Sequence, residues 1–421
     1  MLLYRALAAA SLAAYAPWAL LRSLTGGKRL GDIRGRLGKR PYPDLAGGVW
    51  IHAVSVGEVG VARNLLRALI LPDTRFGVSV STAAGRDLAE RTLAGRADVF
   101  AFPFDLAGPV ERALTAVRPG VVALTETEIW PLFIERAQRH GVPVALVNGR
   151  ISERSFQRYG RVRRWLAPTL NRIALFAMQS EEDARRIVHL GAPAARVRVF
   201  GNLKYDLPEA PPFADAQRLR AVAAGRPIVV AGSTGEGEEL VLLEALERLE
   251  KKPFLVLAPR RPERFESVAT LLESRGVPYV RRSSADATPP AAVYLLDSIG
   301  ELGSAYREAT VAFVGRSLIP GGGQNPIEAW AAGVSVLAGP HMENFRDVAA
   351  SGEALGILRR VSDGASLARE LEAALSSPRE TAGRGADASR FVAESRGAAA
   401  ATAQALAALA SPASRGRTSS P

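Results

Sequence analysis

The chain has 421 residues, which is enough for two domains of ordinary size. It contains no cysteine, and this excludes disulfides, thiolate nucleophiles and cysteine-ligated metal sites. The formal net charge of +12 favours an acidic partner, such as a phosphorylated ligand, a nucleic acid or an anionic membrane surface. Neither a zinc-finger spacing nor an RNA-binding aromatic motif is present, so nucleic acid is the least favoured of the three.

The first 24 residues are the clearest targeting signal in the chain. They include an uncharged run, Ala6–Leu21, which is short for a membrane span and contains Pro17. A cleaved signal peptide, a short membrane anchor and a helix lying in the membrane interface are all compatible with this run. Basic residues follow it from Arg22 to Arg40, and this asymmetry keeps the rest of the chain on the cytoplasmic side. We therefore expect residues 1–24 to form an uncleaved anchor or interfacial helix, with the basic stretch against anionic lipid.

Short apolar runs alternate with longer helical patterns along the chain. The runs that we expect to be strands are residues 49–55, 77–82, 99–104, 121–126, 143–149, 175–180, 197–202, 227–233, 254–260, 292–297, 311–317 and 334–339. Most of them are continuously apolar rather than alternating, which is typical of parallel strands buried on both faces. The repeated order of strand and helix predicts doubly wound α/β sheets.

A stretch rich in proline and aspartate, residues 203–218, divides the chain into two halves that each carry a series of strands and helices. We therefore expect an α/β protein with two Rossmann-like domains that face a cleft, over residues 25–205 and 206–410. The last residues, 411–421, are rich in serine, proline and arginine, and we expect a disordered tail there.

In the second half, polar residues follow the expected strands at the ends where doubly wound sheets bind ligands. Arg260 comes directly after the run FLVLAP and is suited either to grip a phosphate or to form a surface salt bridge. Ser233 and Thr234 precede a helix start, where backbone N–H groups bind an anion or small side chains cap the helix. Glu301 falls in an expected first helical turn, where a cap is the more common role.

The segment VGRSLIPGGGQNPIEAWAAG, residues 314–333, is the most informative stretch of the second half. Its three consecutive glycines allow a backbone to approach a ligand closely, and a helix is expected directly after them. Asn325 and Glu328 share one face at the start of that helix, where a carboxylate can bind ribose hydroxyls or complete a capping box. The glycines favour the ligand site, because capping alone does not require them. The four histidines of the chain are scattered, which argues against a metal cluster.

In the first half, Glu126 and Glu128 follow an expected strand and precede Trp130, which favours a fixed, partly buried turn over a solvated loop. Arg150 follows the next expected strand. The stretch RYGRVRRW, residues 158–165, supplies further guanidinium groups that could bind an acidic or phosphorylated acceptor, and a solvated basic helix is the alternative.

Glu58 stands in the stretch AVSVGEVG, where an apolar run enters a glycine-containing turn and then a helix. A strand, turn and helix of this kind often prepare a phosphate site, but an anionic side chain at the turn opposes a bound phosphate. A helix cap or a catalytic acid–base group explains the carboxylate better, and the local residues alone leave both open.

These stretches follow one another from residue 55 to residue 345 as SVGEV, TETEIWP, NGRISERS, GNLKYD, AGSTGEGEE, PRRPERF, DSIGEL, FVGRSLIPGGGQNPIEAWAAG and GPHMENF. In this order they resemble the 3-deoxy-D-manno-octulosonic acid (Kdo) transferases of lipopolysaccharide synthesis. The resemblance implies a GT-B glycosyltransferase that moves Kdo from CMP-Kdo onto a lipid A precursor, lipid IVA, with inversion and without a metal or other cofactor. It also implies attachment to the cytoplasmic face of the inner membrane through the N-terminal hydrophobic segment.

The resemblance also assigns roles to residues. Glu58 matches the general base, residues 25–205 match the acceptor-binding domain, and residues 206–410 match the CMP-Kdo-binding domain. The positions that match CMP-binding segments are Pro259, Arg260, Gly300, Glu301, Leu302, Asn325, Pro326, Ile327 and Glu328. Further candidates for donor contacts are Ser233, Thr234 and Lys204, and those expected to line the cleft are Glu126, Glu128 and Arg150. Gln324 and Gly235 stand where the family usually has histidine, which affects donor contacts rather than the acid–base group.

Other functions compete with this one. Another GT-B enzyme, such as a lipid-linked N-acetylglucosaminyltransferase or a UDP-sugar 2-epimerase, would share the fold, but an epimerase needs no lipid anchor. A non-catalytic, membrane-attached nucleotide-sugar-binding protein is the alternative from a different class, and the presence of Glu58, Arg260 and Glu328 argues against it. For a catalytic Glu58 we expect an ionised carboxylate, because the start of a helix stabilises negative charge.

Overall fold

The computed structural model describes residues 32–284 and 291–411 of the chain. The expected N-terminal helix over residues 1–24 and the expected tail beyond residue 411 lie outside these residues. Within them, none of the helices combines the length and the apolar character that crossing a membrane would need. The chain forms two compact units, Met1–Asp206 with Ser395–Pro421 and Leu207–Glu394.

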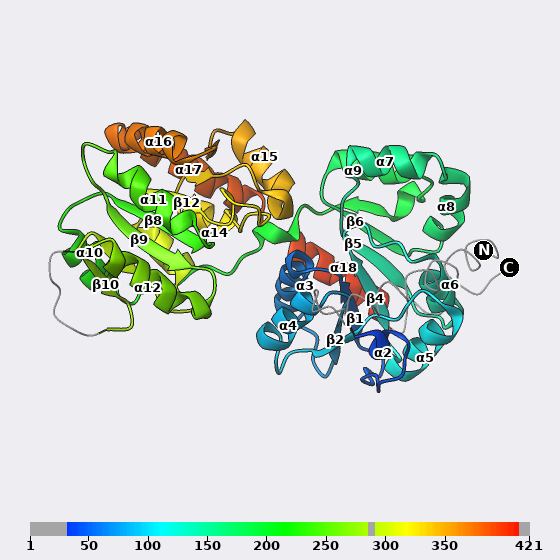
Figure 1. The fold of residues 1–421 in the computed structure, drawn as a ribbon. Coiled ribbons are helices and arrows are strands. Elements are labelled where there is room, and N and C mark those ends of the chain that lie inside the picture. The colour runs from blue at the N-terminus through cyan, green and yellow to red at the C-terminus, as the bar shows by residue number, and fades with distance from the viewer. Residues whose placement is uncertain (1–31, 285–290, 412–421) are drawn as a thin grey trace. The chain divides into compact units, whose positions relative to one another are not determined.

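The first unit is built on a seven-stranded parallel sheet in the order β3-β2-β1-β4-β5-β6-β7 (Figure 1). Its strands are β1 (Val49–Ala53), β2 (Phe76–Val80), β3 (Asp98–Ala101), β4 (Val121–Thr125), β5 (Val144–Gly149), β6 (Leu175–Met178) and β7 (Val197–Val199). Its helices are α2 (Ile33–Arg36), α3 (Val56–Ala68), α4 (Ala83–Thr92), α5 (Ala107–Val117), α6 (Pro131–Arg139), α7 (Glu153–Gly160), α8 (Arg163–Leu170), α9 (Glu181–His189), α18 (Ala398–Ala410) and the short 3-10 turns η1 (Ala194–Arg196) and η2 (Leu203–Tyr205).

The second unit carries another seven-stranded parallel sheet, in the order β10-β11-β9-β8-β12-β13-β14. Its strands are β8 (Ile228–Thr234), β9 (Phe254–Pro259), β10 (Tyr279–Arg281), β11 (Val293–Leu295), β12 (Val311–Val314), β13 (Val336–Ala338) and β14 (Leu358–Arg360). Its helices are α10 (Ala216–Ala223), α11 (Glu238–Glu247), α12 (Phe265–Ser274), α13 (Leu302–Ala305), α14 (Ile327–Ala331), α15 (Arg346–Ala354), α16 (Gly364–Ser376), α17 (Pro378–Glu394) and the 3-10 turns η3 (Pro262–Arg264), η4 (Tyr306–Glu308) and η5 (Glu343–Phe345).

The two parallel sheets confirm the prediction made from the continuous apolar runs, each of which contributes a strand. The central strands β1, β4, β9 and β12 are buried along their whole length, as expected for strands covered on both faces. Two strands were not expected, β10 and β14. Each has three residues and includes arginine, so neither forms an apolar run, and both lie at an edge of the second sheet.

Helices cover both faces of the first sheet. One face packs α5, α6, α8 and α9 against a core around Trp50, and the other packs α3, α4 and α18 against the neighbouring side chains of β1, Val49 and Ile51. Successive residues of a strand point to opposite faces, so β1 supplies both cores.

The last helix, α18, belongs to a different unit from the one that the sequence predicted. We expected residues 206–410 to form one domain, but the second unit ends at Glu394 and α18 packs against α3 on the first sheet. The carboxylate of Asp206 accepts hydrogen bonds from the N–H groups of Gly397 at 2.7 Å and Ala399 at 2.8 Å, which fixes the start of this helix beside the end of the first half. An alanine-rich helix can approach either sheet closely, so composition alone does not reveal its partner.

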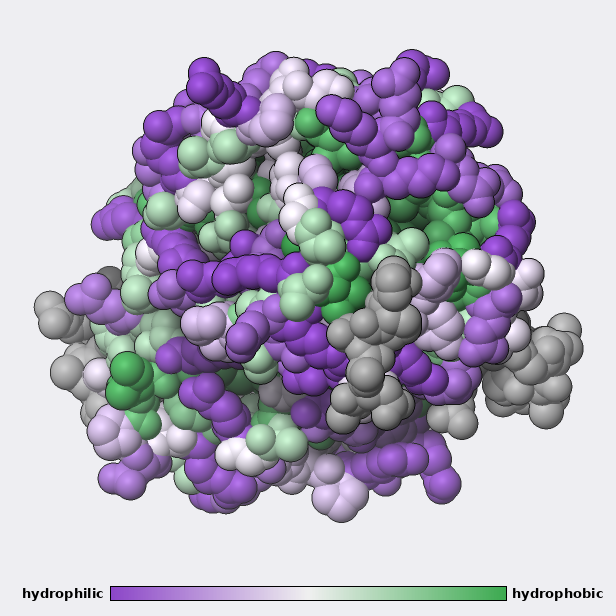
Figure 2. Space-filling model, turned by 90° about the vertical axis from the view of Figure 1, so that its left-hand side faces the viewer, coloured by the Kyte–Doolittle hydropathy of each residue, from purple (hydrophilic) through white to green (hydrophobic). Residues whose placement is uncertain are grey.

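The surface is largely hydrophilic on the face drawn in Figure 2, where apolar residues form small, separate patches. Among the described residues, the large apolar side chains that are exposed are Ile33, Val56, Ile70, Val162, Trp165, Val199, Ile299 and Leu355. Most of them come from separate parts of the sequence and need no special explanation. Val162 and Trp165 are the exception, because both belong to one arginine-rich segment.

In each sheet the strand order reverses beside the first strand of the unit. β1 lies between β2 and β4, and β8 lies between β9 and β12. Such a reversal is where open α/β sheets bind ligands, beyond the carboxyl ends of the strands. The topology therefore places residues 54–58 beside residues 125–128 in the first unit, and residues 233–239 beside residues 315–318 in the second.

Candidate active site

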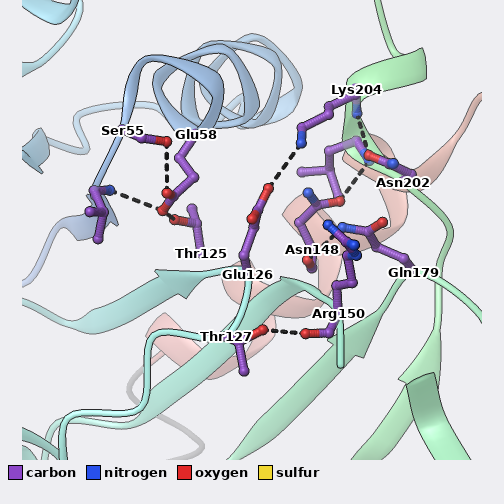
Figure 3. A network of polar contacts seen from close by, with 12 residues as sticks. Ser55, Glu58, Thr125, Glu126, Thr127, Asn148, Arg150, Gln179, Asn202 and Lys204 are labelled. Carbon is purple, nitrogen blue, oxygen red and sulfur yellow. Dashed lines mark hydrogen bonds and ion pairs between the residues drawn. The ribbon is translucent and has the colours of Figure 1, made fainter. Parts of the chain in front are cut away.

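Glu58 lies beyond the carboxyl end of β1, in the first turn of α3. It is 7% exposed, and its side chain turns back over the end of the strand (Figure 3). The carboxylate accepts hydrogen bonds from the N–H of Val54 at 2.9 Å, from Ser55 Oγ at 2.9 Å and from Thr125 Oγ1 at 2.6 Å. Donors from the ends of two adjacent strands therefore fix one buried carboxylate.

The contacts of Glu58 include part of a helix cap, which is one of the two roles that the sequence left open. In a capping box, the glutamate in this position accepts from the N–H of the N-cap residue. Here it accepts from Val54, one residue before the N-cap Ser55, and the side chain of Ser55 makes no capping hydrogen bond to α3. Both carboxylate oxygens also contact hydroxyl groups, which a cap alone does not need.

Burial is the main influence on the acidity of Glu58. It raises the pKa of the carboxyl above its usual value, and the negative charge of Glu126 raises it further, while the hydrogen bonds from Thr125, Val54 and Ser55 act in the opposite direction. The net shift is upward. The expected stabilisation of the ionised form by the start of α3 is therefore outweighed, because the carboxylate is removed from water. A carboxylate with a raised pKa binds a proton more readily and is a stronger base.

Thr125 offers one hydroxyl proton to two acceptors. Its Oγ1 lies 2.7 Å from the carbonyl oxygen of His52 and 2.6 Å from Oε2 of Glu58. A hydroxyl donates one hydrogen and accepts through its lone pairs. When Thr125 donates to His52, the short contact to Glu58 is satisfied by a proton on the glutamate. The same geometry thus accommodates the ionised and the protonated carboxyl of Glu58.

Glu126 and Glu128 follow β4 and lie close enough to Glu58 for their charges to interact with it. Glu126 has a left-handed backbone with φ of 54°, and its Oε1 forms an ion pair with Nζ of Lys204 at 3.0 Å. Figure 3 shows Lys204 reaching this carboxylate from the side away from Glu58. Burial raises the pKa of Glu128 to about 7, helped by the charges of Glu58 and Glu126. Three neighbouring carboxyls thus share one edge of the sheet, and one of them titrates near neutral pH.

A set of amide side chains that the sequence did not single out holds the loop of Lys204 in place. Asn148 is fully buried, and its Oδ1 accepts a hydrogen bond from the N–H of Leu203 at 3.0 Å. Gln179 Nε2 donates to the carbonyl oxygen of Asn148 at 3.0 Å, and Asn202 Oδ1 accepts from the N–H of Lys204 at 3.0 Å (Figure 3). A detectable signal was present at Asn148, which stands near the end of the buried strand β5 with a left-handed backbone, φ of 54°, a conformation that asparagine tolerates.

Arg150 lies next to this set, one residue beyond β5. Its carbonyl oxygen accepts a hydrogen bond from Thr127 Oγ1, which joins the loop after β4 to the loop after β5 (Figure 3). Glu58, Glu126, Glu128 and Arg150 therefore lie at the same edge of the first sheet. Lys204, which was a candidate for donor contacts, also lies in this unit, paired with Glu126, and not with the other donor candidates in the second unit.

In the second unit, Ser233 and Thr234 form a kink at the end of β8. Ser233 has a left-handed backbone with φ of 56°, and the register between β8 and β9 shifts between Gly232 and Thr234. Gly315, at the end of the adjacent strand β12, packs against this kink. A Cβ atom on Gly315 would lie 2.5 Å from the carbonyl oxygen of Ser233 and 2.5 Å from Cα of Thr234, so only glycine fits.

Glu238 is a buried carboxylate that the sequence analysis did not single out. It accepts hydrogen bonds from four backbone N–H groups, those of Gly235 at 2.8 Å, Arg316 at 2.5 Å, Ser317 at 2.8 Å and Leu318 at 2.9 Å. The loop after β8 and the loop after β12 are thereby joined. A Cβ atom on Gly235 would lie 3.0 Å from Cγ of Arg316, which explains the small residue at this position.

Arg260 follows Pro259, the buried last residue of β9, and is itself exposed. Its Nε donates to Oε1 of Gln324 at 2.8 Å. Oδ1 of Asn325 accepts a hydrogen bond from the N–H of Ile327 at 3.1 Å, which closes an Asx turn at the start of α14. Pro326 is the N-cap residue of that helix. Glu328 is in the first turn of that helix.

The side chain of Glu301 does not cap a helix, which was the role considered from the sequence. It makes no side-chain cap bond to α13. Instead, both its oxygens accept from the guanidinium of Arg282 at 3.0 Å, and Ser298 Oγ also donates to it. Burial acts to raise the pKa of Glu301, but Ser298 and Arg282 hold it below its usual value. Gly300, with φ of 90°, and Leu302, which begins α13, complete this segment.

The second-unit candidates lie at the carboxyl edge of the second sheet, and two contacts connect their loops. One is the bond between Arg260 and Gln324. The other is the close approach of α13 and α14, where a Cβ atom on Gly303 would lie 3.8 Å from Oε2 of Glu328. Within residues 32–284 and 291–411, no group of three or more histidine, aspartate or glutamate side chains is placed to hold a metal ion.

Comparison with known proteins identifies relatives over most of the chain. Residues 27–207 match the family model described as 3-deoxy-D-manno-octulosonic-acid transferase (kdotransferase). The 3-deoxy-D-manno-octulosonic acid transferase of Bordetella pertussis is 37% identical over 349 residues, covering 78% of this chain and 79% of the relative. The enzyme of the same name from Haemophilus influenzae is 33% identical over 385 residues, covering 88% of this chain and 89% of the relative.

Among solved structures, a putative UDP-N-acetylglucosamine 2-epimerase from Listeria monocytogenes has the same fold, with a TM-score of 0.55, 16% identity, and coverage of 90% of this chain and 99% of that chain. At that identity the likeness concerns the fold alone. The sequence relatives are much closer and extend over most of the length of both proteins. This chain therefore belongs to the family of 3-deoxy-D-manno-octulosonic acid (Kdo) transferases and is a glycosyltransferase.

Proposed function

We propose that this enzyme transfers Kdo from CMP-Kdo to the lipid A precursor lipid IVA in lipopolysaccharide synthesis, with inversion at the anomeric carbon. The observation that carries the proposal is the buried carboxylate of Glu58, held by three donors at the strand reversal of the first sheet. Its raised pKa suits a group that must take a proton from a sugar hydroxyl. Membership of the Kdo transferase family supplies the substrates.

The two units divide the work in this proposal, as in other GT-B enzymes. The first unit binds the acceptor, and the second binds the CMP portion of the donor. The second assignment is supported by the exposed Arg260, which presents positive charge directly after β9, and by the loops after β8 and β12, which lie at the same edge of the sheet. The first assignment is supported by the ion pair of Glu126 and Lys204, which presents charges of both signs at the edge of the sheet where Glu58 lies.

In the proposed reaction, Glu58 accepts the proton of an acceptor hydroxyl while that oxygen forms a bond to C2 of Kdo. The bond between C2 and the phosphate oxygen breaks, and CMP leaves with the electron pair. Thr125 keeps a hydrogen bond to Glu58 in both protonation states, because its hydroxyl can turn between donating and accepting. Direct displacement at C2 accounts for inversion.

The negative charge that develops on the departing phosphate needs stabilisation. Arg260 supplies it in the proposed mechanism. A guanidinium group binds phosphate oxygens strongly and stays charged at all relevant pH values. For this reason we propose no metal ion and no other cofactor in the reaction.

We propose that the enzyme works at the cytoplasmic face of the inner membrane, attached through its N-terminal segment. The stretch of residues 161–165 supports a membrane surface as partner, because it combines three arginines with two exposed apolar residues, Val162 at 47% and Trp165 at 59% exposure. Arginine and tryptophan are the side chains that favour an anionic membrane interface. Sedimentation of the full chain with anionic and with neutral vesicles tests the location, and equal partitioning into both would contradict it.

The activity is tested with the purified full chain, a tetra-acylated lipid A precursor and CMP-Kdo generated in the reaction mixture. Mass spectrometry should show the acceptor with added Kdo, and an unmodified acceptor in the presence of intact CMP-Kdo would refute the function. Removal of a general base typically costs about 10²–10⁴-fold in rate, so Glu58→Gln should lower kcat by that factor. Glu90→Gln, at an exposed position of α4, is the matched control. Undiminished transfer by Glu58→Gln would reject the base and leave the function standing.

A further inference from the structure

One side-chain contact in the second unit joins two loops that carry donor-binding candidates. Arg260 is the first residue after β9, and Gln324 belongs to the loop between β12 and α14. Arg260 Nε donates to Gln324 Oε1 at 2.8 Å, across 64 positions of the sequence. Neither residue belongs to a helix or strand, so the contact joins two loops.

The loop that carries Gln324 is held from both sides. Gly322 and Gly323 have left-handed backbones with φ of 80° and 70°. The N–H of Gly323 donates to the carbonyl oxygen of Arg316 at 2.8 Å, and the N–H of Asn344 donates to the carbonyl oxygen of Gly322 at 2.9 Å. A Cβ atom on Gly322 would collide with the side chain of Asn344. The side chain of Gln324 therefore extends from a fixed backbone.

The orientation of the amide follows from its two partners. Gln324 Nε2 donates to the carbonyl oxygen of Gly323 at 3.2 Å, so its oxygen faces the N–H of Arg260. A flipped amide would place two donors against each other. The amide is neutral at every relevant pH, so it orients the guanidinium without offsetting its positive charge, as a carboxylate would.

We propose that Gln324 is a positioning residue that orients the guanidinium of Arg260 toward the phosphate of CMP-Kdo. This inference rests on the proposed function, because it takes Arg260 as a phosphate-binding residue. A guanidinium has five N–H donors in one plane, and a partner at Nε fixes that plane for the others. Gln324 thereby contributes to donor affinity through Arg260, while the proton transfer at Glu58 does not depend on it.

The test measures KM for CMP-Kdo and kcat with the full chain at pH 6 to 8. Gln324→Met keeps the length of the side chain but removes the acceptor, and it should lower kcat/KM for CMP-Kdo about tenfold, which corresponds to about 1.4 kcal/mol, because Arg260 acts on the phosphate both in the bound donor and as it departs. Gln324→His should resemble the wild type at pH 8 and the methionine variant at pH 6. A neutral imidazole accepts a hydrogen bond, whereas an imidazolium, formed below a pKa of about 6.5, only donates and repels Arg260.

The wild-type pH profile is the baseline for that comparison. The charged and titratable groups around the loop are Arg260 after β9, Arg316 after β12, Glu328 on α14, and the pair of His341 and Glu343 at 3.3 Å. All of them are present in the wild type and in both variants. A drop in donor affinity between pH 8 and pH 6 that appears only in Gln324→His is therefore due to the introduced imidazole.

A double-mutant cycle shows whether Gln324 acts through Arg260. In the background of Arg260→Ala, Gln324→Met should cause no further loss of CMP affinity, measured by calorimetric titration. Additive losses, or a kcat/KM unchanged in Gln324→Met, would overturn the inference while leaving the proposed function intact. A wild-type chain that neither binds CMP nor transfers Kdo would overturn both. Thermal midpoints within about 2 °C of the wild type show that the variants are folded.

Discussion

Replacing Glu238 by glutamine changes one oxygen of a fully buried carboxylate into an amide nitrogen and leaves its shape unchanged. In the wild-type chain, Oε2 accepts from the N–H groups of Gly235 and Arg316, and Oε1 accepts from those of Ser317 and Leu318. The oxygen of a glutamine can keep one of these pairs. The other pair would face an NH₂ group, so two buried N–H donors would lose their acceptor.

The size of the effect follows from those two lost bonds. A buried donor left without an acceptor costs about 1–3 kcal/mol, and a hydrogen bond to a charged group contributes about 1.5–3 kcal/mol. With some relaxation of the loops, we expect the second unit to lose about 3–4 kcal/mol of stability. Whole domains have only about 5–15 kcal/mol, and each kcal/mol lowers the thermal midpoint of a domain of this size by about 2–4 °C. The midpoint should therefore fall by roughly 10 °C.

Differential scanning calorimetry of the full chain is the suitable assay, because a protein with two units need not unfold in one step. Glu236→Gln is the matched control, since Glu236 is exposed and lies only two positions before Glu238. The transition of the second unit should move in Glu238→Gln and stay in place in the control. If both variants unfold at the wild-type temperature, the four hydrogen bonds do not stabilise the unit as we argue.

Two further predictions concern single positions. Glu128→Gln should be more stable than the wild type at pH 8 and equal to it near pH 4. Burial raises the pKa of Glu128 to about 7 in the folded wild type, so ionisation at pH 8 favours the unfolded chain, whereas glutamine does not ionise. Thermal unfolding at both pH values checks this, and equal midpoints of variant and wild type at pH 8 would contradict it. Gly315→Ala should lower both the thermal midpoint and the affinity for CMP, since its Cβ would meet the backbone of Ser233 at 2.5 Å, whereas Gly383→Ala, with no atom within 4 Å, should do neither.

The type of fold was predictable because parallel strands buried on both faces must be apolar at every position. Twelve apolar runs were sufficient to predict both sheets, and each run became a strand. The edge strands β10 and β14 escaped prediction because they have three residues each and carry arginine. An edge position tolerates such residues, since one side of the strand is open to solvent.

The unit to which α18 belongs could not be predicted from local sequence, for a different reason. Its sequence is mostly alanine, which predicts a helix but gives no polar pattern that would indicate a particular neighbour. The information lies elsewhere in the chain, in Asp206, whose carboxylate accepts from the first N–H groups of that helix. An aspartate nearly two hundred positions away cannot be recognised as a cap from local sequence.

The candidate site was predictable to the extent that topology determines it. Residues after β1 and β4 had to meet, because the strand order reverses there and both strands end at the same edge. The supporting contacts depend on side-chain packing instead. Asn148 holds the N–H of Leu203 across 55 positions, and Glu238 holds residues from 78 to 80 positions away. Neither spacing corresponds to any local motif.

Glu58 illustrates why burial must be known before a chemical role is assigned. At an exposed helix start, a glutamate has a lowered pKa and is a poor proton acceptor. In the folded chain the same side chain is buried, and its pKa is raised by desolvation and by Glu126. Its position, by contrast, is determined by the ends of β1 and β4, through Val54 and Thr125. The proton affinity of Glu58 thus comes from its burial and from Glu126, whereas its position comes from the ends of β1 and β4. A glutamate at a helix start is suited to accept a proton only where it is both buried and held in place in this way.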